Sequence, residues 1–127
     1  MKYNLKKETK PTLTTFGKWK AVASHHQTVE SEDIIKEVSQ LSSLSEGTVI
    51  SVMSGLSEVI SRHLRRGDKV RLPDLGLLKL EIESDKVDDP TSFKATQHIR
   101  GVRLHFLPES DKGTPALYQD ISFEREP

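Results

Sequence analysis

The sequence predicts an α+β fold, in which two N-terminal helices precede a three-stranded antiparallel β-sheet with a protruding arm, followed by a short C-terminal helix. Three observations support this prediction. Apolar residues recur at helical spacing over residues 34–64, they alternate with polar residues after Gly67, and a polar stretch at residues 84–95 interrupts the alternation. A period that changes from about 3.6 residues to about 2 indicates a chain that passes from helices into a sheet.

Two serines mark where the helices begin. Ser31 is a favourable N-cap, because the acids Glu32 and Asp33 follow it in the first turn, where the helix dipole stabilises negative charge. Ser45 caps a second, longer helix, and apolar residues form a wide stripe along it over residues 49–64. This stripe is wider than a monomer of this size can cover. We therefore interpret it as a dimer interface, with an ordinary core helix as the alternative.

The residues after Gly67 alternate as those of half-buried strands do. A turn is expected at residues 73–76, because proline, aspartate and glycine are typical turn residues. A short helix near residues 115–120 and a last short strand at residues 121–123 complete the predicted order. The three main strands are expected at residues 69–72, 78–83 and 101–106.

The composition excludes several classes of protein. The chain has 127 residues and no cysteine, so it has no disulfide framework, no thiolate metal site and no cysteine nucleophile. No apolar run approaches the roughly 20 residues that cross a bilayer. Neither a glycine-rich phosphate loop nor a Gly-x-Ser-x-Gly elbow is present, and the adjacent His25 and His26 would point to opposite faces of a strand. We therefore expect no enzyme, no cofactor, no metal site, no membrane association and no small-molecule substrate.

Charge is distributed unevenly along the chain, although 19 basic and 19 acidic residues give a formal net charge of zero. Six lysines oppose only Glu8 in residues 1–20, whereas six acids oppose only Lys36 in residues 30–61. Because proteins that bind DNA through its phosphates usually carry a positive excess, the distribution of charge matters more here than its sum. The sequence thus predicts a basic tail followed by an acidic helical segment.

One stretch carries most of the resemblance to a known family. Residues 66–72, RGDKVRL, would end a helix and start a strand, and Leu75-Gly76 would form a glycine hairpin. With these features the chain resembles the HU/IHF family of bacterial histone-like proteins over residues 28–118, and its extra N-terminal segment is similar to that of an extended HU-like subgroup. Supporting matches lie at residues 33–35, 44–45 and 102–108.

The resemblance implies a fold and a function. Two chains would form an intertwined homodimer, whose helices make a base and whose sheets make a saddle, and the added pieces would widen the sheet. A β-arm from each subunit would reach around the minor groove of DNA, where a proline wedges between base steps and kinks the duplex. The implied protein is cytoplasmic, bacterial and nucleoid-associated, and it bends double-stranded DNA without sequence specificity. It would act as a homodimer, with an HU-like paralogue as the alternative partner.

The resemblance also implies a division of the chain. A basic N-terminal extension with possible strands would occupy residues 1–27, the HU-like domain residues 28–120, and a short strand or tail residues 121–127. Strand residues in the extension are expected near Tyr3 and after Trp19. These two aromatic side chains would pin the extension to the sheet, with stacking on a nucleic-acid base as the alternative.

The candidate DNA contacts come from the sheet and from the arm. Contacts on the sheet face opposite the apolar strand residues are expected at Lys69, Arg71, Lys79 and Arg103. Contacts on or near the arm are expected at Lys86, Lys94 and Arg100, with Pro90 as the wedge at the tip.

Acidic residues stand at several positions where the family is basic, and they support an alternative function. The acids at the arm base, before Pro90 and after Pro108 are Glu81, Glu83, Asp88, Asp89 and Glu109. In the alternative, the same dimer has lost most of its DNA affinity and serves as a protein-interaction module. Pro90 is then an ordinary turn proline, and the cations belong to a solvated sheet face.

Overall fold

The chain folds into two compact units, and the α+β part of the predicted fold class is confirmed. This computed structural model describes residues 1–110 and 116–127. One unit comprises residues 1–37 and 120–127, and the other comprises residues 38–119. The predicted functional division at residues 27 and 120 stays a prediction, because compactness alone does not define a functional domain.

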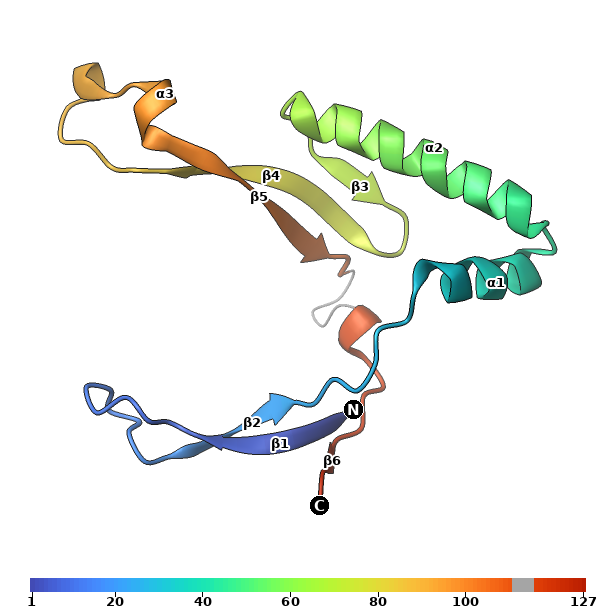
Figure 1. Ribbon diagram of the computed structural model, residues 1–127, viewed down its shortest axis with the longest axis horizontal. Helices are drawn as coiled ribbons and strands as arrows, with labels where there is room; N and C mark the ends of the chain where they lie inside the picture. Colours follow the sequence, from blue (N-terminus) through green and yellow to red (C-terminus); the bar gives the residue numbers. More distant parts are fainter. Residues whose placement is uncertain (111–115) are drawn as a thin grey trace. The chain divides into compact units, whose positions relative to one another are not determined.

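The two predicted helices are both present (Figure 1), as α1 (Ser31–Ser42) and α2 (Glu46–Arg65). The predicted cap of the first helix is wrong by one residue, because the carbonyl of Glu30 already accepts the N–H of Ile34 at 3.2 Å. The predicted cap of the second helix is confirmed. The hydroxyl of Ser45 accepts the N–H of Thr48 at 3.1 Å, which satisfies one of the free donors of the first turn. At the other end, Gly67 follows α2 with a φ of 89°, a conformation that glycine adopts without strain.

The main sheet consists of three antiparallel strands in the order β3 (Val70–Leu72), β4 (Gly76–Ser84) and β5 (Ile99–Pro108). Strand β5 is longer at both ends than the alternation predicted. Cross-strand pairing places the apolar residues on one face, with Leu78 opposite Phe106, Leu80 opposite Leu104, and Ile82 opposite Val102. Helix α2 contacts β3 and β4. The period-2 pattern therefore predicted correctly which residues share a face.

The arm ends in a small folded tip rather than in a simple turn. Figure 1 shows β4 and β5 running past β3 and joined through helix α3 (Ala95–His98), which follows the 3₁₀ turn η1 (Pro90–Ser92). The carboxylate of Asp89 caps η1 by accepting the N–H of Thr91 at 3.1 Å. The Nδ1 atom of His98 accepts the N–H of Lys94 at 2.8 Å. These local contacts stabilise a tip that the sequence analysis assigned only to a polar excursion.

The N-terminal extension forms a sheet of its own, in the order β2 (Trp19–Ala23), β1 (Lys2–Lys7) and β6 (Glu124–Arg125). Two expectations are therefore wrong. Within this chain the added strands do not widen the main sheet, because β1, β2 and β6 pair with one another and none of them pairs with β3, β4 or β5. The last strand also lies later than residues 121–123. The N–H of Glu124 donates to the carbonyl of Met1, and the N–H of Glu126 donates to the carbonyl of Tyr3.

One face of this small sheet is apolar and open. A hollow of about 580 Å³ lies on it, and its lining residues are Met1, Tyr3, Leu5, Ala21, Ala23 and Phe123. Near the C-terminus, the predicted short helix is present as the 3₁₀ turn η2 (Ala116–Tyr118), while Pro115, where that prediction began, lies outside the described residues. Within the described ranges, no helix is long and apolar enough to cross a membrane.

The single chain has almost no hydrophobic core. Among the described residues, the buried hydrophobic side chains are those of Val49 and Leu64, both on α2. Most of the stripe of α2 is otherwise exposed, with Val52 at 59% and Leu56 at 49% of full exposure. A folded domain has to bury enough apolar surface to offset the entropy that its chain loses. With these two buried side chains, the described residues of one chain bury little apolar surface.

Candidate nucleic-acid interface

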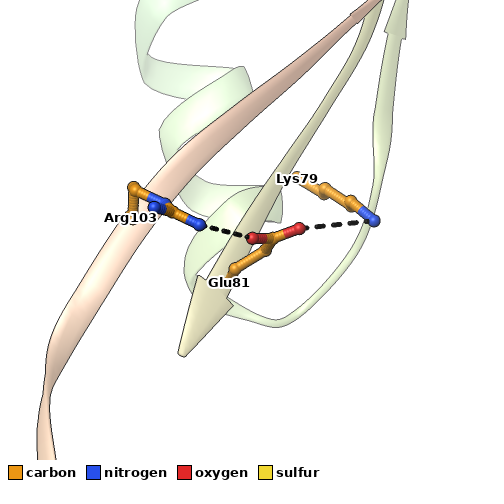
Figure 2. Close-up of polar contacts among 3 residues, drawn as sticks. All are labelled: Lys79, Glu81 and Arg103. Atoms are coloured by element: carbon orange, nitrogen blue, oxygen red, sulfur yellow. Dashed lines mark hydrogen bonds and ion pairs between the residues drawn. The ribbon is translucent and has the colours of Figure 1, made fainter. Parts of the chain in front are cut away.

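Three of the charged residues on the polar face of the main sheet form one ion-pair cluster (Figure 2). Glu81 lies directly opposite Arg103 in the register of β4 and β5, and Lys79 lies two residues before it on the same face. The Glu81 carboxylate accepts a hydrogen bond from the Arg103 guanidinium at 3.1 Å and lies 3.6 Å from the Lys79 ammonium. One carboxylate thus bridges two of the cations that were predicted to contact DNA.

The surroundings of Glu81 favour its ionised form. The hydrogen bond from Arg103 lowers the pKa of this carboxyl group below its ordinary value, and electrostatic interactions with His105, Lys79 and Arg103 lower it further. Desolvation acts in the opposite direction and does not outweigh them. A glutamate is ordinarily ionised at neutral pH, and the lowered pKa keeps Glu81 in this form, so the cluster offers a phosphate one net positive charge instead of two.

Two further predicted cations are paired with acids. The Arg71 guanidinium lies 2.9 Å from the Glu109 carboxylate, and the Arg100 guanidinium lies 2.6 Å from that of Asp85. Both arginine side chains are largely exposed, so solvent screens these pairs and a phosphate could compete for either arginine. The pairing nevertheless lowers the positive potential that the sheet and the arm base present.

Over the described ranges, the other residues that were predicted to contact DNA from the arm and the sheet are not paired with acids in this way. In the part of the chain that the structure describes, no ion pair involves the side chain of Lys69, Lys86 or Lys94. Pro90 is exposed and occupies the first position of η1, directly after the capping Asp89. Proline suits such a position, because its φ is already that of a helical turn. Whether any of these residues touches DNA stays a prediction.

Comparison with models of known protein families identifies the family of this chain. The HU-HIG model, described as an HU domain fused to a winged helix-turn-helix, Ig or glycine-rich motif, matches residues 1–125. This chain belongs to the HU-HIG family. The predicted kinship with HU-type proteins is therefore confirmed, and the match includes the N-terminal extension as well as the main domain.

This HU-HIG chain also has a fold similar to that of a solved structure. It is similar to a crystal structure from Bacteroides vulgatus ATCC 8482 that is provisionally described as a bacterial DNA-binding protein, with 14% sequence identity and a TM-score of 0.61. The similarity covers 84% of this chain but only 40% of that one. Among curated proteins, none matches this sequence at a significant level.

The stretch that carries the HU resemblance also has a structural role in this HU-HIG chain. After Gly67, the N–H of Asp68 donates to the carbonyl of His63 at 3.1 Å, and the Asp68 carboxylate lies 3.0 Å from the Nδ1 atom of the same histidine. This hydrogen bond lowers the pKa of Asp68. Asp68 therefore connects the residues just before β3 to the last turn of α2 by hydrogen bonds.

The acidic partners of the cations were not predicted from the sequence, although one of them, Glu81, could have been found. Glu81 and Arg103 follow from the strand register, because residues directly opposite on antiparallel strands form pairs. Asp85 and Glu109 could not be matched to their arginines in this way, since both lie outside the regular alternation. Among the described residues, no group of three histidine, aspartate or glutamate side chains is placed to hold a metal ion.

Proposed function

We propose that this HU-HIG chain binds double-stranded DNA as a homodimer, without strong sequence preference, and bends it. The observation that carries the proposal is the match of an HU-domain family over residues 1–125. A sheet with one polar, cation-bearing face and an arm beyond it supports the same function, because phosphate contacts supply most of the affinity of non-specific DNA binding. In a bacterial cell, such a protein would act on the nucleoid in the cytoplasm.

The exposed stripe on α2 supports the dimer. Its apolar side chains run along the helix at helical spacing, and a second copy of the chain would cover them and complete the core. The exposed apolar side chains of this stripe are Ile50, Val52, Met53, Leu56 and Val59. An HU-like paralogue with a matching stripe is the alternative partner.

A second candidate function is supported by the ion pairs. Four of the predicted DNA-contacting cations already have a carboxylate partner within the subunit. A dimer with such a neutralised face could serve as a protein-interaction module instead of a DNA-bending protein. The two candidates differ in one measurable property, which is the affinity of the dimer for duplex DNA.

We expect the protein to bind a nicked or pre-bent duplex more tightly than a straight one. Unstacking base steps costs a few kcal/mol, and a nick or a pre-formed bend removes part of that cost. Fluorescence anisotropy with labelled straight, nicked and pre-bent duplexes at several salt concentrations measures this preference. Affinity should fall linearly with salt on a log–log scale. If none of the duplexes is bound even at low salt, the interaction module is the better proposal.

Replacing the bridging carboxylate should strengthen DNA binding. Glu81→Gln releases both Lys79 and Arg103, so we expect the log–log salt slope to steepen by about 1 to 2, because each further phosphate that is neutralised adds roughly 0.9. The matched control is Glu83→Gln, which removes the same charge from the same face but releases no cation among the described residues. Equal slopes for the two variants would show that the ion-pair cluster does not limit DNA binding.

A further inference from the structure

We propose that the loop end of the β1–β2 hairpin is a second DNA-binding surface, which holds the phosphates of the duplex. The inference rests on the proposed function, because it assumes that the ligand of this protein is duplex DNA. We call this surface the hairpin patch, and define it by five exposed lysines. They are Lys6, Lys7, Lys10, Lys18 and Lys20.

The register of the hairpin gathers these lysines at one end. Lys6 lies directly opposite Lys20, and Lys7 lies opposite Trp19. The hairpin continues past the paired strands, because the N–H of Glu8 donates to the carbonyl of Lys18 at 2.9 Å. Like charges that face each other across two strands destabilise a sheet. A bound polyanion would relieve this repulsion.

The patch is not neutralised by the protein. In residues 1–29 there is one acid, Glu8, and its carboxylate accepts the backbone N–H of Lys10 at 3.0 Å. None of the five lysines takes part in an ion pair among the described residues. The cations of the main sheet are different, since Lys79 and Arg103 share one carboxylate. Among the described residues, the hairpin patch therefore carries five cations without an ion pair, whereas four of the cations predicted on the sheet and arm are paired with acids.

Apolar side chains lie among these lysines. Trp19 is 62% exposed, and the Lys7 ammonium lies 5.9 Å from the centroid of its ring. Phe16 and Leu13, in the loop, are 55% and 45% exposed. Protein–DNA contacts go mostly to phosphate and sugar, and a basic surface with exposed apolar groups can contact both. This mixture favours DNA over a purely acidic peptide as the ligand.

The single tryptophan of the chain makes the proposal directly testable. Trp19 is the one tryptophan in the sequence, and it lies opposite Lys7 at the end of the hairpin that carries the patch, so its fluorescence reports on this end of the hairpin. We expect titration of the full chain with a straight duplex to change the Trp19 emission, and added salt to reverse the change. Anisotropy of the labelled duplex, measured in parallel, reports total DNA binding whichever surface provides it.

Three variants separate the hairpin patch from the sheet. The quadruple variant Lys6→Gln, Lys10→Gln, Lys18→Gln, Lys20→Gln should lose the Trp19 response, and its log–log salt slope should fall by about 3 to 4 for each engaged hairpin. Arginine at the same four positions keeps the charge and should restore both readouts, which excludes a folding defect. The variant Lys69→Gln, Lys86→Gln, Lys94→Gln should keep the Trp19 response.

Each outcome bears on one proposal or on both. If the wild-type protein binds DNA while the quadruple glutamine variant keeps its slope and its Trp19 response, the inference fails and the proposed function stands. If Trp19 responds but bent and straight duplexes bind equally, the inference stands and bending is contradicted. A wild-type chain that binds no duplex overturns both. A Trp19 response to polyglutamate but not to DNA would overturn the inference in favour of an acidic protein partner.

Discussion

Leu56→Asp should leave a chain that does not fold. The side chain of Leu56 is 49% exposed in the single subunit and lies on the stripe of α2 that we propose as the dimer interface. Burying a leucine contributes about 1.5 to 3 kcal/mol, and the variant would replace this contribution with a carboxylate that loses its water in the interface. Each dimer carries the change twice. We therefore expect the loss of the cooperative thermal transition seen by circular dichroism.

The matched control places the same charge on the other side of the helix. Ser54 lies about 200° from Leu56 around α2, so Ser54→Asp adds a carboxylate away from the proposed interface. This variant should keep its transition within about 0.5 kcal/mol of the wild-type stability. For the wild-type chain, apparent stability should rise by about 1.4 kcal/mol for each tenfold increase in concentration, as for any obligate dimer. A compact, folded monomer at nanomolar concentration would contradict the proposed dimer.

The regular part of the fold could be predicted because its signal is local. The stripe of α2 and the alternation of β4 and β5 are each visible in consecutive residues, and the alternation predicts which side chains share a face, as Leu80 and Leu104 do. The Ser45 cap is also a local signal. Helix α3 could not be predicted in this way, because four residues contain little more than one helical turn and show no apolar period.

What depends on contacts distant in sequence was missed. Strand β6 has two residues, and it exists because Glu124 and Glu126 donate to the carbonyls of Met1 and Tyr3 at the other end of the chain. The net charge of the candidate site was predicted wrongly for the same reason. The cations were predicted by type and by face, but their partners are fixed by the fold, as with Arg71 and Glu109, which are 38 residues apart.

Gly76→Ala should destabilise the protein strongly. Gly76 is buried at the start of β4, directly opposite Pro108. A Cβ atom at this position would clash with the carbonyl oxygen of Leu107 and would lie 2.8 Å from the ring of Phe106. The carbonyl belongs to the β5 backbone and cannot move without disturbing the pairing of the strands. We expect the free energy of unfolding to fall by about 3 kcal/mol, the upper part of the usual range for overpacked sites.

Denaturant unfolding at one fixed protein concentration measures this loss, and Gly47→Ala is its control. A Cβ at Gly47 would meet no atom within 4 Å, and this residue lies in the first turn of α2. Alanine there should be neutral or should stabilise the helix by up to about 1 kcal/mol. An unchanged midpoint for Gly76→Ala would mean that β5 can shift at this point. If the loss is as large as expected, the glycine of the Leu75-Gly76 pair that marks the HU resemblance is required by the close approach of two backbones, whether or not the main sheet binds DNA.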